Sequence, residues 1–378
     1  MDFTKLDEFM SKMPERGFPS AEIAVTVKGE LVYRRSVGYA DSAKTRKCSS
    51  DDLYWLFSAT KVVTCLAALT LVESGKIKLD DELSKYLPAF KNMKIKHKDG
   101  TLTDATKPIT IEQLFAMTCG IGYNLTTPEV LEASDRLAST VETVSAMAAE
   151  PLYFEPGTHY KYSLSHDVLA AIIEVVSGMR YSEYLKKVFF GPLGIVDMGF
   201  DPTAAQLERF SAMYKYKTGL SKSVEVENKN VYRLSENYES GGAGLFGSVD
   251  EYIKIITMAA CGGKAPDGTQ ILMPETIRLC MVNRLCEDAL DDFVVQKFYG
   301  YGWGLCGRVH TEPVVSLSRS PAGEFGWDGA AGAFAMIDPI NELAFFFATN
   351  VHSCTYVYNI IHPTLRNLVY ECLEENEK

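Results

Sequence analysis

The sequence predicts an α+β protein, an α/β/α sandwich in which an antiparallel sheet with flanking terminal helices accompanies an inserted, mostly helical domain. Two observations lead to this fold class. Segments that alternate in the manner of β-strands occur near both ends of the chain, whereas the long middle stretch has helical patterning. We therefore expect residues 1–57 and 205–378 to form the sheet domain, and residues 58–204 to form the helical domain.

The first predicted element is a β-hairpin. Residues 23–27 and 31–37 are rich in Val, Ile, Leu and Thr, and they flank a turn at Lys28-Gly29-Glu30. A glycine-containing turn between two such runs is typical of a hairpin. The middle of the chain, roughly residues 58 to 200, then reads as helices joined by polar loops.

Strand patterns return after about residue 210. Residues 333–337 and 343–349 are apolar runs on either side of a turn at residues 339–342, which predicts a second pair of adjacent strands. The final segment, from about Tyr356 to Glu375, reads as a helix. Strands from both ends of the chain are thus expected to meet in one sheet.

Composition and charge exclude several classes of function. The chain has 378 residues and a formal net charge of −11, without a concentrated basic face, so we expect no nucleic-acid partner. No segment approaches the apolar length that a membrane span needs. The first residues lack a charged and then apolar leader, and the nine cysteines form no tight framework, which favours a cytoplasmic protein with free thiols. Its oligomeric state stays open.

The most informative motif is Ser58-Ala59-Thr60-Lys61, at the start of an apolar helical run. On a helix, residues i and i+3 share a face, so the Ser58 hydroxyl and the Lys61 amine can lie side by side. A serine alcohol needs a base to become a good nucleophile, and a desolvated lysine can serve as that base. By itself Ser-x-x-Lys is also common at ordinary helix starts.

Two further segments follow in order. Residues 156–164 contain Pro-Gly and then Tyr162, ahead of a helical pattern, and residues 325–332 read Phe-Gly-Trp-Asp-Gly-Ala-Ala-Gly between predicted strands. Tyr160 is a rival to Tyr162, but the spacing from Pro156-Gly157 favours Tyr162.

Taken together, these motifs resemble the serine β-lactamase and penicillin-binding protein superfamily. Within it, the chain is most similar to the class C β-lactamase-like carboxylesterases and their acyltransferase relatives. Residues 109–123, 241–245 and 299–304 also have counterparts in the family, and the resemblance runs from about residue 20 to about residue 350. It implies a β-lactamase/transpeptidase-like fold with the active site at the seam between the two domains.

The resemblance also implies roles for individual residues. Ser58 would attack an acyl carbonyl and form an acyl-enzyme, Lys61 would accept or relay the serine proton, and Tyr162 would share the acid–base work. The backbone N–H groups of Ser58 and Ala330 would form the oxyanion hole. Gly329, like Ala330, is small enough for close approach of the substrate.

Two departures from the family pattern bear on the substrate. The second motif is Tyr-Ser-Leu where β-lactamases have Tyr-x-Asn, and Leu164 cannot donate amide hydrogen bonds. In the third motif Trp327 replaces the usual cation, so recognition of a carboxylate loses its strongest local interaction, and Asp328 would repel it. Both changes favour an ester with an apolar or aromatic acyl group over penicillin or D-Ala-D-Ala.

Further residues are candidates for the wall of the substrate pocket or for a ligand site. Trp327, Tyr123 and Tyr301 are candidate wall residues of the substrate pocket, although each is equally consistent with core packing. Residues 242–247 match G-x-G-x-x-G, but no buried strand precedes them. The six histidines show no H-E-x-x-H pattern and no cysteines show C-x-x-C spacing, so we expect neither a metal nor a cofactor.

The sequence therefore favours a serine hydrolase that cleaves carboxylic esters, acting on a small-molecule ester or acyl donor. An acyltransferase that passes the acyl group to an alcohol or amine is the main alternative. A D-amino acid amidase or peptidase and a β-lactamase are minor alternatives. A non-catalytic ligand-binding or scaffolding protein with the same fold is a hypothesis of a different class.

Overall fold

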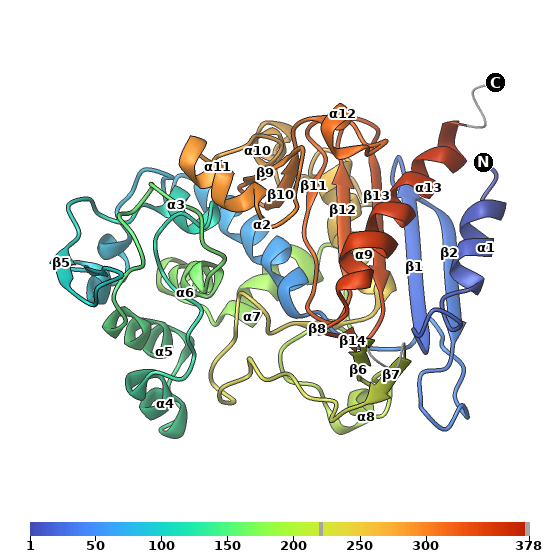
Figure 1. Ribbon diagram of the computed structural model, residues 1–378, viewed down its shortest axis with the longest axis horizontal. Coiled ribbons are helices and arrows are strands. Elements are labelled where there is room, and N and C mark those ends of the chain that lie inside the picture. The colour runs from blue at the N-terminus through green and yellow to red at the C-terminus, as the bar shows by residue number, and fades with distance from the viewer. Residues whose placement is uncertain (219–221, 375–378) are drawn as a thin grey trace.

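A seven-stranded antiparallel sheet lies beside a mostly helical region in the computed structural model, which describes residues 1–218 and 222–374 (Figure 1). The order of strands is β2-β1-β13-β12-β11-β10-β9, so strands from both ends of the chain meet at its centre. The strands are β1 (Ser20–Val27), β2 (Glu30–Gly38), β9 (Tyr301–Gly304), β10 (Gly307–His310), β11 (Phe325–Gly326), β12 (Phe334–Asp338) and β13 (Leu343–Ala348).

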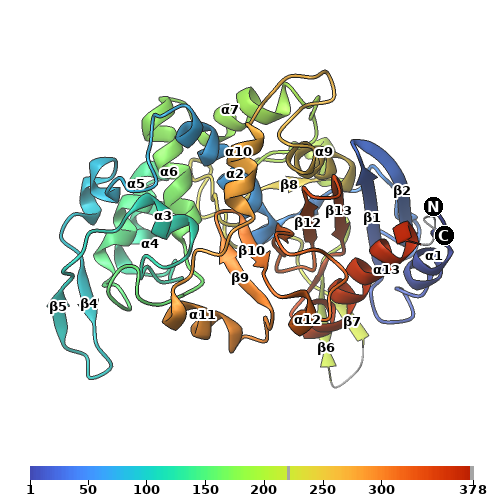
Figure 2. The ribbon, with the colours of Figure 1, turned by 90° about the horizontal axis from the view of Figure 1, so that it is seen from above.

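Helices cover both faces of this sheet. The terminal helices α1 (Thr4–Ser11) and α13 (His362–Glu374) pack on one face, and α9 (Val249–Ala260) packs on the other (Figure 2). The predicted α+β class is therefore confirmed. Helix α9, which covers the second face, is not a terminal helix, however. It comes from the part of the chain where the sequence indicated mainly strands.

Alternation along the central strands explains why both faces are buried. Ile23 and Phe345 contribute to the apolar cluster beneath α1 and α13, whereas Ala24 and Phe346 belong to the cluster on the α9 side. Successive strand residues point to opposite faces, so one strand supplies both cores. On the α9 side, the ring of Tyr252 stacks on Phe346 with centroids 4.0 Å apart.

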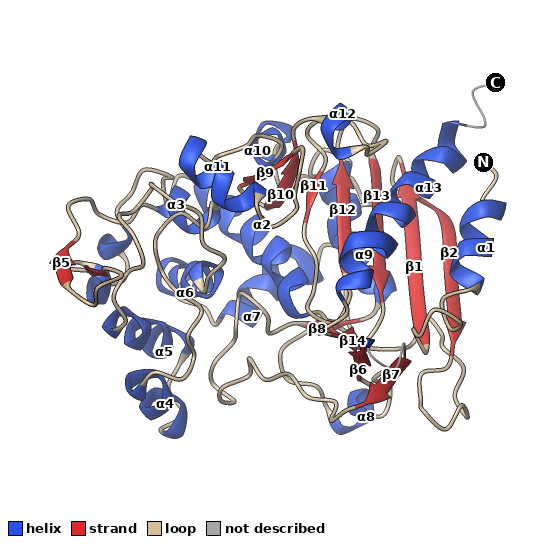
Figure 3. Cartoon of the chain, in the orientation of Figure 1, coloured by secondary structure: helices blue, strands red, loops and turns tan. Residues whose placement is uncertain are grey.

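The helical region is centred on α2 (Thr60–Glu73), which is buried along most of its length and contacts α6 (Ser165–Ser177). Figure 3 shows helices gathered on this side of the molecule and strands on the other. Other elements of this region are α3 (Ile111–Phe115), α4 (Pro128–Asp135), α5 (Thr140–Ala146), α7 (Tyr181–Leu185) and the hairpin of β4 (Lys94–Lys96) and β5 (Leu102–Asp104). Helix α8 (Ala204–Leu207) lies below the sheet in the view of Figure 1. Across the described parts of the chain, every helix is too short or too polar to cross a membrane.

Short elements connect the two regions. Strand β3 (Tyr54–Trp55) pairs with β8 (Phe246–Gly247) directly before α2 begins. The other short strands and helices of the chain are β6 (Tyr214–Lys217), β7 (Lys222–Glu225), β14 (Val351–His352), α10 (Pro274–Cys280), α11 (Glu287–Val294) and α12 (Pro313–Ser316).

The local predictions near the termini agree with these elements. Strands β1 and β2 form the expected hairpin, and β12 pairs with β13 across the expected turn. The C-terminal helical segment begins with a wider turn at Val357–Ile361 and continues as α13 to Glu374; the predicted end at Glu375 lies outside the described residues.

Replacing Phe346 with alanine should destabilise the protein by about 3–5 kcal/mol, because a fully buried aromatic ring is removed from the contact between β13 and α9. Denaturation by guanidinium chloride, followed by circular dichroism, measures the change. Val196→Ala is a suitable control since Val196 is 80% exposed. A midpoint for Phe346→Ala equal to that of the control would contradict the prediction.

Candidate active site

Ser58 lies in a short helical turn, Phe57–Ala59, that leads directly into α2. The chain enters this turn from β3, and the Leu56 N–H donates to the carbonyl of Leu245 at 2.9 Å. Phe57 has a φ of +46°, in the left-handed region that non-glycine residues rarely adopt. Backbone strain of this kind costs about 1–3 kcal/mol and often marks functional sites. Here it sits directly beside the candidate nucleophile.

Lys61 is one helical turn further on and is 1% exposed. Its Nζ lies 3.4 Å from Ser58 Oγ and donates to the carbonyl oxygen of Gly242 at 2.7 Å. A buried amine needs such partners because its desolvation is otherwise costly. The predicted serine–lysine pair is thus brought together, and a backbone carbonyl orients the lysine.

Two tyrosines complete the surroundings of this amine. Lys61 Nζ lies 4.6 Å from the ring centroid of Tyr162 and 5.5 Å from that of Tyr123, and the two rings stack on each other. The indole N–H of Trp327 donates to the Tyr162 hydroxyl at 3.0 Å. Burial raises the pKa of Tyr123, and the nearby Ser58 hydroxyl offsets part of that rise. Ser58, Lys61, Tyr123, Tyr162 and Trp327 therefore form one cluster.

Tyr160, the rival to Tyr162, points elsewhere. Its ring packs against Phe293 and Trp303, and its hydroxyl is buried. The geometry thus favours Tyr162 as the tyrosine of the site.

One buried carboxylate was missed by the sequence analysis. Asp167, in the first turn of α6, accepts hydrogen bonds at Oδ1 from Tyr238 (2.7 Å) and Ser240 (2.5 Å). Its Oδ2 has no hydrogen-bond partner among the described residues. A Cβ added to Gly242 would lie 2.4 Å from this Oδ2 and 3.3 Å from Lys61 Nζ, so the carboxylate and the amine flank the same small space.

The sequence offered little signal for Asp167. An acidic residue in the first turn of a helix is common because it interacts favourably with the helix dipole. The donors that hold Asp167 come from a segment more than 70 residues away in sequence.

The second oxyanion candidate, Ala330, lies on the turn between β11 and β12. A Cβ on Gly329 would lie 2.4 Å from the carbonyl oxygen of Leu56, so the glycine lets this turn approach the chain just before Ser58. Ala330 packs against the cluster that contains Phe57. In the described parts of the chain, the backbone N–H groups of Ser58 and Ala330 have no acceptor. The absence of a side chain at Gly329, which we expected to admit the substrate, thus also allows the close contact with the Leu56 carbonyl.

Tyr301 is not placed with the other candidates. It stacks on His310 with ring centroids 4.6 Å apart and lies against the guanidinium of Arg308. Trp303, two residues along β9, instead contacts Trp327 at a centroid distance of 4.5 Å. The strand therefore presents a different aromatic residue to the cluster than the sequence indicated.

The two departures from the family motifs take different positions. Leu164 is buried in the apolar core at the start of α6. Asp328, expected to repel a substrate carboxylate, instead lies with its Oδ1 3.7 Å from Arg308 Nη1 and 3.6 Å from His362 Nδ1. The Arg308 guanidinium offsets the charge of Asp328, so repulsion of a substrate carboxylate is weaker than the sequence indicated.

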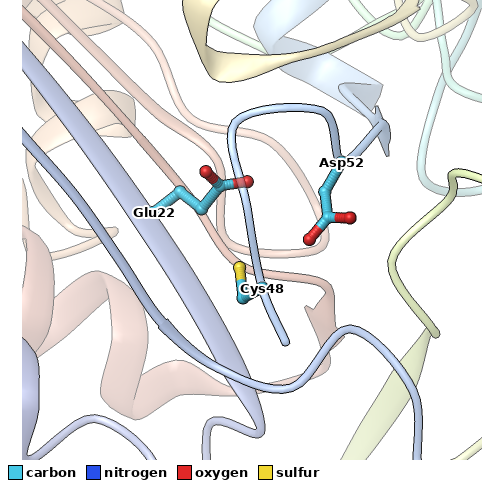
Figure 4. A group of neighbouring side chains, drawn as sticks. All are labelled: Glu22, Cys48 and Asp52. Atoms are coloured by element: carbon cyan, nitrogen blue, oxygen red, sulfur yellow. The ribbon is translucent and has the colours of Figure 1, made fainter. Parts of the chain in front are cut away.

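Figure 4 shows a further buried group, Glu22, Cys48 and Asp52, whose potential ligand atoms lie within 4.8 Å of one another. The carboxylates already pair with arginines, Glu22 with Arg34 and Asp52 with Arg46. Burial raises the pKa of Glu22, and Arg34 opposes that rise. The acceptor oxygens are thus used in ion pairs, so this group fits a structural role better than a metal site.

A cavity of about 970 Å³ opens between α9, α10 and the turn of the β1–β2 hairpin. None of the residues that line it belongs to the cluster around Ser58. This hollow is therefore distinct from the candidate active site.

Comparison with known families agrees with the cluster around Ser58. A family model described as Beta-lactamase matches residues 6–353. The chain belongs to the beta-lactamase family.

Proteins that are similar to this chain carry different descriptions. The chain is 28% identical to Esterase EstB of Burkholderia gladioli over 367 residues, covering 90% of this chain and 88% of that protein. Its fold is similar to that of EstCE1, described as a hydrolase with promiscuous acyltransferase activity (TM-score 0.81, 23% identity, 97% and 98% of the two chains). It also resembles a variant of simvastatin synthase from Aspergillus terreus (TM-score 0.82, 22% identity, 99% and 98%).

In this beta-lactamase family member, Asp167→Asn should lower kcat/KM for p-nitrophenyl butyrate by about tenfold. The substitution removes the negative charge that flanks the Lys61 amine, and with it an electrostatic interaction that helps hold the amine beside Ser58. Initial rates of p-nitrophenol release measure the change.

The matched control is Ser240→Ala, which removes one hydrogen bond to Asp167 but keeps its charge. Its kcat/KM should stay within about twofold of that of the unmodified protein. The neighbouring His166 is uncharged near neutral pH, because burial lowers its pKa to about 3, so it adds no charge to this comparison. Equal values of kcat/KM in Asp167→Asn and Ser240→Ala would show that the charge of Asp167 does not act on Lys61.

Proposed function

We propose that this protein is a serine esterase that cleaves carboxylic esters through a Ser58 acyl-enzyme. The observation that carries the proposal is the buried Lys61 amine, 3.4 Å from Ser58 Oγ and over the face of Tyr162. A buried amine beside a hydroxyl at a helix start is suited to activating a serine.

Each proposed step uses one group of the cluster. Lys61 takes the proton of Ser58 while the serine oxygen attacks the ester carbonyl. The N–H groups of Ser58 and Ala330 stabilise the resulting oxyanion. The departing alcohol receives a proton through Tyr162, and water then attacks the acyl-enzyme with the same groups acting in reverse.

The surroundings of Tyr162 favour an ester over a β-lactam. Trp327 donates a neutral N–H to the phenol, so it supports Tyr162 without offering a charge to a substrate carboxylate. Leu164 is buried and provides no amide donor. The similarity to EstB supports the same choice.

Ser58→Ala should abolish hydrolysis of p-nitrophenyl butyrate, with a loss of at least about 10³-fold, because no acyl-enzyme can form. Release of p-nitrophenol measures the rate, and an alkyl phosphonate should label Ser58 only in the unmodified protein. A chromogenic cephalosporin assayed in parallel should be turned over poorly. Full ester turnover in Ser58→Ala would refute the proposed nucleophile, and faster turnover of cephalosporin than of ester would favour a β-lactamase.

Transfer of the acyl group to an alcohol is a second candidate function. The description of EstCE1 names promiscuous acyltransferase activity for a protein of similar fold. If the acyl-enzyme accepts alcohols, adding a short-chain alcohol should divert product from free butyrate to the butyrate ester of that alcohol while release of p-nitrophenol continues. Chromatography of the two products gives the ratio, with Ser58→Ala as the control. A product ratio that does not change with added alcohol would contradict acyl transfer and would leave hydrolysis as the only proposed activity.

A further inference from the structure

The turn at residues 329–332 carries Ala330, whose N–H is the second proposed oxyanion donor. The turn is closed by its own backbone, since the Gly332 N–H donates to the Gly329 carbonyl at 2.9 Å and the Gly329 N–H donates to the Ala333 carbonyl at 2.8 Å. These bonds set the shape of the turn. The Val351 N–H of β14 ties one side of it by donating to the Ala331 carbonyl at 2.9 Å, and the Gly329–Ala330 peptide then needs a tie of its own.

That tie comes from the C-terminal helical segment. The hydroxyl of Tyr358 donates to the carbonyl oxygen of Gly329 at 2.9 Å. One turn further along, His362 Nε2 lies 3.2 Å from the carbonyl oxygen of Gly332. Residues four apart share a helix face, so both side chains reach the same turn. The His362 ring is held in place by stacking on Phe334, with centroids 4.5 Å apart.

The carbonyl that Tyr358 binds belongs to the same peptide group as the Ala330 N–H. A trans peptide is planar, with its C=O and N–H pointing in opposite directions. A donor fixed on the C=O therefore fixes the direction of the N–H. It also polarises the peptide, since hydrogen bonds in a chain strengthen one another at low dielectric.

We propose that Tyr358 is a positioning residue for the oxyanion hole, which orients and polarises the Ala330 N–H through the Gly329–Ala330 peptide, with His362 supporting the same turn. This inference rests on the proposed esterase function. Tyr358 needs its proton to donate, and burial together with the Asp328 carboxylate raises the pKa of its phenol.

The test uses Tyr358→Phe in the full chain, with Tyr370→Phe as the matched control. Tyr370 lies on the same helical segment and also donates a buried hydrogen bond, to Asp338 Oδ2 at 2.5 Å. Both variants lose one hydroxyl, so their thermal midpoints should fall by similar amounts. Only Tyr358→Phe should lose about tenfold in kcat for p-nitrophenyl butyrate, with KM within about twofold.

A second measurement separates positioning from general loosening. Butylboronic acid forms a tetrahedral adduct with an active-site serine, so its inhibition constant reports on the oxyanion hole. It should weaken by about the same tenfold in Tyr358→Phe and stay unchanged in Tyr370→Phe. Equal losses in both variants, or wild-type kcat and inhibition in Tyr358→Phe, would overturn the inference.

The supporting role of His362 has its own pair of variants. His362→Gln keeps an N–H near the position of Nε2, whereas His362→Leu keeps only bulk. The glutamine variant should retain several times more kcat than the leucine variant, and equal rates would remove His362 from the proposal. Failure of the proposed function is distinguishable, because it would appear as activity that survives Ser58→Ala.

Discussion

Burial of one amine is the constraint on which the site depends. Lys61 is removed from water at the start of α2, and a buried lysine is costly unless the protein supplies partners. Those partners come from the segment 240–245, which runs along α2. The Gly242 carbonyl accepts from Lys61, Thr64 donates to the Gly241 carbonyl, and Thr60 accepts from the Leu245 N–H. The small residues of this segment allow its backbone to come this close.

The same requirement links the two regions of the molecule. The chain before Ser58 is held by pairing with β8 on one side and by close contact of Gly329 with the Leu56 carbonyl on the other. Between these contacts Phe57 is kept at a φ that an isolated chain would avoid. The turn that carries Ser58 and the turn that carries Ala330 are therefore held against each other directly, and a distortion of either backbone would displace the other.

Sequence patterns captured the local features and missed those that depend on distant partners. The hairpin of β1 and β2 and the Ser58–Lys61 pair could be predicted because each depends on residues that are close together in the sequence. The covering helix α9, the carboxylate of Asp167 and the position of Tyr301 could not, since each depends on which segments meet in space. The orientation of Asp328 was within reach, because neighbours in an extended segment face opposite sides and Trp327 was already assigned to the pocket.

Trp327 stands where the family motif usually has a cation, and this replacement changes more than the charge that a substrate would meet. In a site that binds a carboxylate, an ammonium beside the tyrosine both attracts the substrate and stabilises a phenolate. The indole N–H of Trp327 retains a hydrogen bond to Tyr162 while its ring joins the aromatic group formed with Trp303 and Phe298. Acid–base support is thereby separated from charge recognition. Under the proposed esterase function, a neutral ester would meet the apolar indole ring at this position instead of a cation, and Tyr162 would keep its hydrogen-bond donor.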